Sequence, residues 1–235
     1  MKPEISVIIP ALNEERYIGY PLEGLKSQSF RNFETIVVDG GSSDRTAQIA
    51  KKAGCRVVIH RKGDIAAARN RGVRAARGDL IMFTNADTRA SKNLLGIYHE
   101  LFKNKGVVAA SGPLIPLEQT TRFIRFGYKF ASVYLAKISY HTGKPAISGS
   151  NFIVRKSAFK KCGGFDESLV TYEDLDLAHR LAKVGEVRYV NNAVVATSTR
   201  RIVKWGVFRY ILFNTSNVIR YNLFHDSNKE YEPIR

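Results

Sequence analysis

The chain has 235 residues, of which 44% are hydrophobic and 11% aromatic, so it is long enough for one substantial core and has an ordinary globular composition. Its 37 Lys and Arg against 21 Asp and Glu give a net charge of +16, which indicates a polyanionic partner such as a nucleic acid, an anionic membrane or a phosphorylated substrate. No apolar run approaches the roughly 20 residues of a membrane span, and no signal-peptide pattern opens the chain.

The first hundred residues alternate between strand-like and helix-like patterns. Strands are predicted over 5–9, 33–39, 56–60 and 79–84, and helices over 15–26, 46–53, 66–76 and 91–105. Such alternation with short connections predicts an α/β fold with a mostly parallel, Rossmann-like sheet flanked by helices. Ligands bind beyond the carboxyl ends of such strands, so the segments after Ile9, Val38 and Thr84 are expected to converge on one crevice.

The second half has fewer strands and two amphipathic helical segments. A helix is predicted over 121–139, a strand over 146–154, a helix over 171–184 and a C-terminal amphipathic helix over about 203–223. The segment from 119 to 165 contains no Asp or Glu and nine Lys or Arg. Within it an aromatic row and a basic row run side by side: Phe123, Phe126, Phe130 and Tyr134, beside Arg122, Arg125 and Lys129. We expect one domain over residues 1–235.

Polar residues follow the first two strands. Pro10 is expected to end the opening strand, and Leu12, Asn13 and Glu14 then lie where a ligand would meet the sheet edge; the alternative is a plain loop with Asn13 as a helix N-cap. After the second strand, Asp39 would accept a hydrogen bond from a nucleotide base, or would instead cap the following helix. No dinucleotide fingerprint or P-loop lysine is present, which argues against a dehydrogenase or an NTPase.

Oxygen-bearing side chains also follow the fourth strand. Asn85 and Asp87 would hold Mg²⁺ or Mn²⁺ against a diphosphate, because these ions favour carboxylate and phosphate oxygens. Upstream, Arg69 offers a contact to a phosphate or ribose, with the exposed face of an amphipathic helix as the alternative.

Three acidic residues, Glu173, Asp174 and Asp176, stand at the start of a predicted helix. Neighbouring carboxylates raise one another's proton affinity, which suits a general base. The alternative is a capping box, because Thr171 stands three residues before Asp174.

Taken together, these residues resemble the family 2 inverting glycosyltransferases with a GT-A fold. The resemblance covers about residues 5–190, and its motifs occur in order: Ser6–Pro10 with Asn13 and Glu14; Val37–Asp44; Ala68–Asn70 with Gly72; Asn85–Asp87 at the DxD position; Ser148–Phe152; Gly163–Glu167; and Glu173–Leu177. The family implies transfer of a sugar from a nucleotide diphosphate to a hydroxyl or phosphate, with inversion at the anomeric carbon.

The resemblance also assigns roles. It implies that Asp39 contacts the nucleotide base, that Pro10, Leu12 and Glu14 border its pocket, and that Arg69 lies near the ribose or phosphates. Asp87 would bind the metal, Asp174 would deprotonate the acceptor beside Glu173, and Arg200 or Arg201 would steady the departing diphosphate. We expect a nucleotide-sugar-binding half over about 1–110, an acceptor-binding and catalytic half over about 111–200, and an amphipathic segment over about 201–235.

Two residues depart from the family pattern. Asn85 replaces the first Asp of DxD, and Arg89 puts a cation two residues after Asp87, so we expect a weakened metal site or an arginine that partly replaces the ion. The processive Q-x-x-R-W motif is absent, which favours a single sugar addition.

The basic aromatic helix predicts a lipid-linked acceptor or peripheral contact with an anionic membrane; the alternative is that its aromatics pack inward or into a dimer. We expect a cytoplasmic protein with two reduced thiols, Cys55 and Cys162, a nucleotide-sugar donor and no nucleic acid. Three alternatives stay open: a basic nucleic-acid-binding protein, which the net charge supports, a nucleotidyltransferase-like enzyme on a similar sheet, and an inactive nucleotide-sugar binder, which Asn85 supports.

Overall fold

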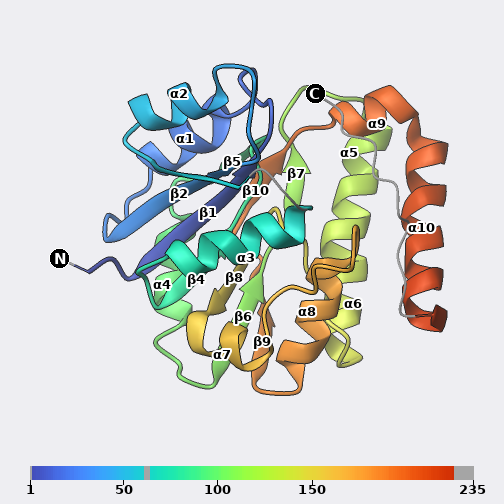
Figure 1. The fold of residues 1–235 in the computed structure, drawn as a ribbon. Helices are drawn as coiled ribbons and strands as arrows, with labels where there is room; N and C mark the ends of the chain where they lie inside the picture. Colours follow the sequence, from blue (N-terminus) through green and yellow to red (C-terminus); the bar gives the residue numbers. More distant parts are fainter. Residues whose placement is uncertain (1, 61–63, 225–235) are drawn as a thin grey trace.

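The central feature is a seven-stranded sheet in the order β3-β2-β1-β4-β8-β6-β9. The computed structural model describes residues 2–60 and 64–224 (Figure 1). Neighbouring strands from β3 to β4 are parallel, as are β6 and β9, whereas β8 is antiparallel to both β4 and β6. The predicted α/β fold with a mostly parallel sheet is confirmed. The strand bounds are β1 Ile5–Ala11, β2 Phe33–Asp39, β3 Arg56–Ile59, β4 Leu80–Phe83, β6 Val107–Ser111, β8 Phe152–Arg155 and β9 Glu186–Tyr189.

Side chains of the central strands alternate between two hydrophobic cores. Ile5, Val7 and Ile9 of β1 point into the core beneath α1 (Gly19–Lys26), α2 (Thr46–Lys52) and α4 (Leu94–Leu101). Ile8 joins the opposite core with α3 (Ile65–Ala75), α7 (Lys156–Lys161) and α8 (Glu173–Ala182). The sheet is therefore covered on both faces, which explains why its strands read as continuous apolar runs.

A second, three-stranded sheet escaped the sequence analysis. Its order is β5 (Thr88–Ala90), β10 (Val195–Thr197), β7 (Leu114–Pro116), with β10 antiparallel to β5 and parallel to β7. Each strand has three residues, too few to show an alternating pattern. The strands β6 and β9 and the helix α7 were also not predicted. The small sheet joins the loop after β4 to the C-terminal part of the chain.

The opening strand and the first helix differ from their predicted bounds. β1 continues through Pro10, which pairs in register with Val38 of β2. The Ile8 carbonyl accepts from Thr84 N–H on the β4 side, and the Ala11 carbonyl accepts from Gly40 N–H on the β2 side. Pro10 stands two residues after Ile8 and so faces the same side as Ile8. Its missing N–H therefore points to the side where β4 has already ended. Helix α1 begins at Gly19 rather than Glu15 because Pro21 has no N–H to extend the helix backward.

The predicted strand over 146–154 is shorter than expected. It forms β8 only from Phe152, because the backbone turns at 148–151, where Asn151 N–H bonds to the Ser148 carbonyl at 2.9 Å. Cys55 and Cys162 are both unbonded and half-buried, and burial raises the pKa of Cys55 to about 11.

Both amphipathic helical segments are present but interrupted. The first consists of α5 (Arg122–Lys129), a π-helix η1 (Phe130–Leu135) and α6 (Ala136–His141). The second is divided at Gly206, whose φ is 77°, into α9 (Arg200–Trp205) and α10 (Val207–Phe224). Both lie at one side of the sheet, away from α1 and α2 (Figure 1). The predicted apolar face of the second segment includes Ile211, Thr215 and Ile219, whose side chains lie outside the described residues, as does the chain after 224. Within the described part of the chain, every helix is too short or too polar to cross a bilayer.

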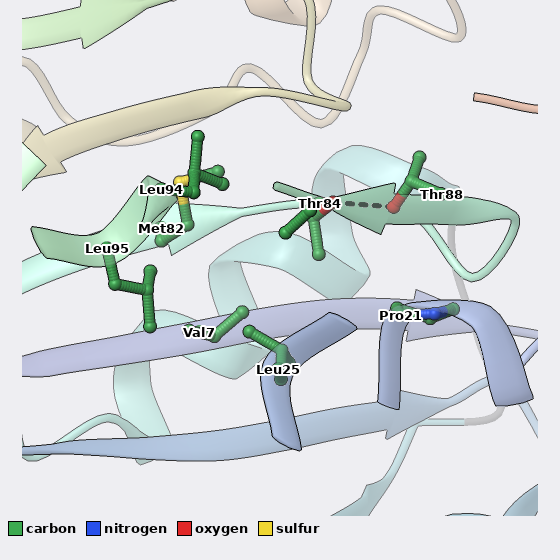
Figure 2. Close-up of a pocket in the computed structure, with 9 residues that line it drawn as sticks. Val7, Pro21, Leu25, Met82, Thr84, Thr88, Leu94 and Leu95 are labelled. Carbon is green, nitrogen blue, oxygen red and sulfur yellow. Dashed lines mark hydrogen bonds between the residues drawn. The ribbon is translucent and has the colours of Figure 1, made fainter. Parts of the chain in front are cut away.

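A small apolar pocket of about 10 Å³ lies between the helices α1 and α4 and the strands β1 and β4 (Figure 2). At its edge the hydroxyls of Thr84 and Thr88 share a hydrogen bond of 2.7 Å, and Thr88 donates to the Asn85 carbonyl at 2.8 Å. These bonds hold the β4–β5 loop, which carries Asn85 and Asp87, in a fixed shape.

Candidate functional site

A cleft of about 810 Å³ opens at the carboxyl ends of β1, β2 and β4. This is where open α/β sheets bind ligands. Most residues that the sequence predicted for the site line the cleft: Pro10, Leu12, Glu14, Arg69, Asn85, Asp87, Glu173, Asp174 and Arg200. Asn13, Asp39 and Asp176 do not line it.

At one end of the cleft, the loops after β1 and β2 bind each other. Asn13 donates its N–H to Ser42 Oγ at 2.9 Å and accepts from Ser43 N–H at 2.8 Å, which requires a left-handed backbone with φ of 53° at Asn13. Asn13 therefore joins two loops, and the prediction that it caps a helix is wrong. Leu12, 36% exposed, and Gly40 form the wall of the cleft at this point.

Asp39 shapes this wall from behind. Its side chain is 2% exposed, and its Oδ2 accepts from the N–H groups of Gly41 and Ser42 at 3.1 and 3.0 Å. The carboxylate thus holds the loop that follows β2 rather than projecting into the cleft, and it bonds within the loop instead of capping α2.

A largely buried arginine, with 17% of its side chain exposed, connects the loops after β1 and β4. Arg200, the first residue of α9, donates two hydrogen bonds of 2.8 and 2.7 Å to the Glu14 carboxylate, and its Nε lies 3.1 Å from Asp87 Oδ2. Its guanidinium also stacks 4.3 Å above the ring of Tyr17. Burial raises the pKa of Asp87 and Arg200 opposes that shift, whereas the two carboxylates raise the pKa of Arg200 against its burial.

A second buried arginine connects α3 to the other end of the cleft. Arg69 is 2% exposed; it donates to Glu173 Oε1 through a short contact and to Asn85 Oδ1 at 3.2 Å. A Cβ at position 149 would lie 2.1 Å from Arg69 Nη2, so any side chain there would force the buried guanidinium to move. Arg69 therefore joins the β4–β5 loop to the start of α8, and the prediction that it lies on an exposed helix face is wrong.

The half-buried carboxylate of Asp174 is oriented by backbone groups. Its Oδ2 accepts from Gly149 N–H at 2.8 Å and its Oδ1 from Leu175 N–H at 2.9 Å. Burial raises the pKa values of both Glu173 and Asp174, and two adjacent carboxylates share the single guanidinium of Arg69, which opposes the shift. A buried base with a raised pKa holds a proton more strongly once it has taken one.

The capping-box alternative is wrong. Helix α8 starts after Tyr172, whose φ is 71°, with no side-chain cap bond among the described residues, and the Thr171 hydroxyl donates to Asn217 Oδ1 at 3.1 Å instead. The third acid, Asp176, points away from the cleft and binds Arg180 and the hydroxyl of Tyr221, the latter at 2.9 Å. Only Glu173 and Asp174 of the acidic trio face the cleft.

The side chains around Asp87 suit a metal ion only in part. Among the described residues no three His, Cys, Asp or Glu side chains cluster as metal ligands. Asn85 is occupied at both ends, accepting from Arg69 and donating to Ser150 Oγ at 2.8 Å. Because Mg²⁺ usually keeps several waters and takes one or two carboxylates with substrate phosphates, Asp87 fits a cation that the diphosphate itself helps to hold. The arginine beside Asp87 is Arg200; Arg89 points away and binds Glu23 at 3.1 Å.

The remaining wall of the cleft was not predicted. It comes from helices far along the chain and mixes apolar and polar side chains: Tyr128 of α5, Arg201 and Ile202 of α9, and Tyr210, Phe213, Asn214 and Asn217 of α10. The one available signal was that Tyr128 stands on the face of its helix opposite the aromatic row.

Comparisons with known proteins agree with this geometry. The family model described as Glycosyl transferase family 2 matches residues 6–163. An uncharacterized glycosyltransferase of Rickettsia typhi is 26% identical over 203 residues, which cover 82% of this chain and 63% of that protein. A Methanococcus voltae protein, named as a dolichyl N-acetyl-α-D-glucosaminyl phosphate 3-β-D-2,3-diacetamido-2,3-dideoxy-β-D-glucuronosyltransferase, is 27% identical over 230 residues, covering 85% and 68%. This chain thus spans about two thirds of the length of these relatives.

Solved structures share the fold. Residues 1–349 of Staphylococcus aureus TarS in complex with UDP-GlcNAc superimpose with a TM-score of 0.68 at 20% identity, covering 97% of this chain and 68% of that one. The mannosyltransferase PcManGT of Pyrobaculum calidifontis in complex with GDP-Man and Mn²⁺ superimposes with a TM-score of 0.70 at 20% identity. The match covers 94% of this chain and 65% of that one. The fold is of the GT-A type, as predicted.

Proposed function

This chain belongs to glycosyl transferase family 2, and from that premise we propose that it transfers a sugar from a nucleoside diphosphate sugar to an acceptor hydroxyl or phosphate, with inversion. The supporting observation is a single cleft with an oriented carboxylate, Asp174, on one wall and the Asp87–Arg200 pair on another. For a hydroxyl acceptor, the oxygen bonds to the anomeric carbon as its proton passes to Asp174. The bond from that carbon to the diphosphate breaks, and its electron pair leaves with the diphosphate.

The surroundings of Asp174 support its role as the base. Two backbone N–H donors hold the carboxylate in one orientation, which limits the reorganisation that proton transfer requires. The raised pKa strengthens the base, and the adjacent Glu173 stays bound to Arg69 and keeps the local charge balanced. Glu173 is thus a positioning residue for Asp174.

The opposite wall supports a donor site. Pro10, Leu12 and Glu14 would border the nucleotide base on a wall that Asp39 holds from behind. Arg200 would place its charge beside the diphosphate. A divalent cation, Mg²⁺ or Mn²⁺, bound at Asp87 would neutralise the charge of the leaving diphosphate. Asn85, occupied by Arg69 and Ser150, would hold the loop in place rather than bind the cation.

The third wall supports an acceptor with apolar parts. Tyr128, Ile202 and Phe213 give this wall an apolar part beside the charge of Arg201, a combination that suits a lipid-linked phosphate better than a free sugar. The name of the Methanococcus voltae relative includes a dolichyl N-acetyl-α-D-glucosaminyl phosphate, a lipid-linked compound, in agreement with this assignment. We assign residues up to about 110 to the donor half and later residues to the acceptor half, and we propose a cytoplasmic location, which the two unbonded thiols support.

A panel of nucleoside diphosphates and nucleotide sugars, with and without Mn²⁺, tests the donor site by thermal shift. A ligand at about 100 times its dissociation constant stabilises the fold by about 2.7 kcal/mol, so the matching nucleotide should raise the melting temperature clearly. Arg200→Met should lose most of that shift. The matched control is Arg89→Met, which removes a cation two residues from Asp87 that faces away from the cleft. No shift with any nucleotide, or an equal loss in both variants, would contradict the donor assignment.

A further inference from the structure

A continuous row of apolar side chains lies exposed along α5, η1 and α6. Phe123 is 69% exposed, Phe126 64% and Ile138 59%. Phe130 and Tyr134 lie between them at four-residue spacing, and both are also exposed. Side chains at this spacing share one face of a helix. None of the eight described residues of α5 is buried, so this helix contributes no side chain to the hydrophobic core.

The rings of this row touch one another. The ring centroids of Phe126 and Phe130 are 6.2 Å apart, and so are those of Phe130 and Tyr134. The row is therefore one strip of apolar surface rather than a set of isolated side chains. Strips of this kind on a soluble protein commonly mark a binding surface for a protein or a membrane.

The opposite face of α5 belongs to the cleft. Tyr128 lines the cleft and is half-buried, while its neighbours Phe126 and Lys129 face outward. The same helix is thus a wall of the site on one side and an exposed strip on the other. Anything that binds the strip would lie next to the acceptor end of the cleft.

The charges beside the strip select its partner. Arg122, Arg125 and Lys129 are exposed and flank the aromatic row, and residues 119–165 contain no acidic side chain. In a symmetric dimer through this face, the basic rows of two copies would meet without an acid nearby to offset them. An anionic bilayer satisfies both rows, because it takes apolar rings at its acyl boundary and cations at its head groups.

We propose that the strip on α5, η1 and α6 docks this protein onto an anionic lipid bilayer, with the rings at the acyl boundary and Arg122, Arg125 and Lys129 among the head groups. Docking brings the helical wall of the cleft to the membrane surface, so that a lipid-linked acceptor would enter past Tyr128. The inference deepens the proposed function and, for the acceptor, rests on it.

Vesicle sedimentation tests the docking surface directly. The wild type should pellet with phosphatidylcholine vesicles that contain about one third phosphatidylglycerol, and should not pellet with pure phosphatidylcholine. The triple change Arg122→Gln, Arg125→Gln and Lys129→Gln should weaken binding about 100-fold, since each basic residue near an anionic surface contributes about fivefold. Phe123→Ser with Phe126→Ser should weaken it by about tenfold or more.

The chain offers a matched control. Lys51→Gln, Lys52→Gln and Arg74→Gln remove the same charge from exposed positions on α2 and α3 and should leave vesicle binding nearly unchanged. All five side chains changed in the two strip variants are exposed, so these variants should fold and keep the wild-type thermal shift with nucleotide.

Several results would overturn the proposal. One is an equal loss of vesicle binding in the control and the strip variants; another is no pelleting of the wild type. A dimer in sedimentation that Phe126→Ser dissociates would show that a second copy covers the strip. Tight binding of a short RNA that the strip variants abolish, without vesicle binding, would identify a nucleic acid partner instead. Nucleotide binding is a separate readout, so failure of the donor assignment and failure of the docking surface are distinguishable.

Discussion

The two walls of the cleft differ in how the chain holds them. On the sheet side, Arg69, Asp39 and Glu173 are almost completely buried, and each is bound by polar or charged groups. On the helical side, α5 contributes Tyr128 to the cleft but has no buried residue among those described, and it exposes its aromatic row to solvent. The contrast teaches that the groups assigned to the chemistry lie in a tightly bonded frame, whereas α5 packs loosely and is suited to meet a partner.

The largest expected effect is on chemistry at the rigid wall. Asp174→Asn should lower kcat by about 10²- to 10⁴-fold with little change in nucleotide binding, because it removes a general base and keeps the shape. Asp176→Asn is the matched control, since Asp176 belongs to the same acidic trio but binds Arg180 and Tyr221 away from the cleft. Transfer assays with an acceptor that reacts through a hydroxyl measure the change, because a phosphate acceptor is already ionised and needs no base. Equal losses of kcat in both variants would assign the effect to folding of α8 rather than to proton transfer.

A pair of glycine substitutions compares the stability of the two walls. Gly149→Ala should lower the free energy of unfolding by about 1–3 kcal/mol, because the new Cβ would overlap the Arg69 guanidinium. Gly127→Ala in α5 meets nothing within 4 Å and should raise it by up to about 1 kcal/mol through helix propensity. Denaturant titration measures both. If Gly149→Ala were neutral, the Arg69 network would be less constrained than its burial indicates.

The smallest expected effect is a dependence on pH that acts in opposite directions on stability and activity. The folded pKa values of Glu173 and Asp174 are raised, so between about pH 4 and about pH 7 this pair binds more protons in the folded protein than in the unfolded chain. The contribution of this pair to the free energy of unfolding should therefore fall as the pH rises through this window. Transfer activity should rise across the same window, because the base must be deprotonated.

Glu173→Gln separates these two effects. It removes one of the two titrating carboxyls and should flatten the fall in stability measured by denaturation at successive pH values. If the stability of Glu173→Gln changed with pH in the same way as that of the wild type from about pH 4 to about pH 7, ion pairing with Arg69 would offset burial at this pair.

Much of the candidate site followed from the residues alone, because the carboxyl ends of parallel strands meet at one edge. The polar residues after β1 and β4 could therefore be grouped without coordinates, and Glu14 and Asp87 do line one cleft. What the pattern did not show was the direction of each side chain. Asp39 turns into its own loop, and Asp176 turns away from the cleft although it stands two residues from Asp174.

The sequence by itself determined the alternation of strands and helices in the donor half, the position of the cleft and the membership in the family, because all three depend on local patterns in chain order. Only the tertiary structure decided which groups pair across the chain. Arg200 binds Glu14 across 186 positions, and Arg69 binds Glu173 across 104, and neither pairing leaves a local signal. Such pairs form because a buried charge must find a partner of opposite sign, and only the folded backbone determines which one lies within reach.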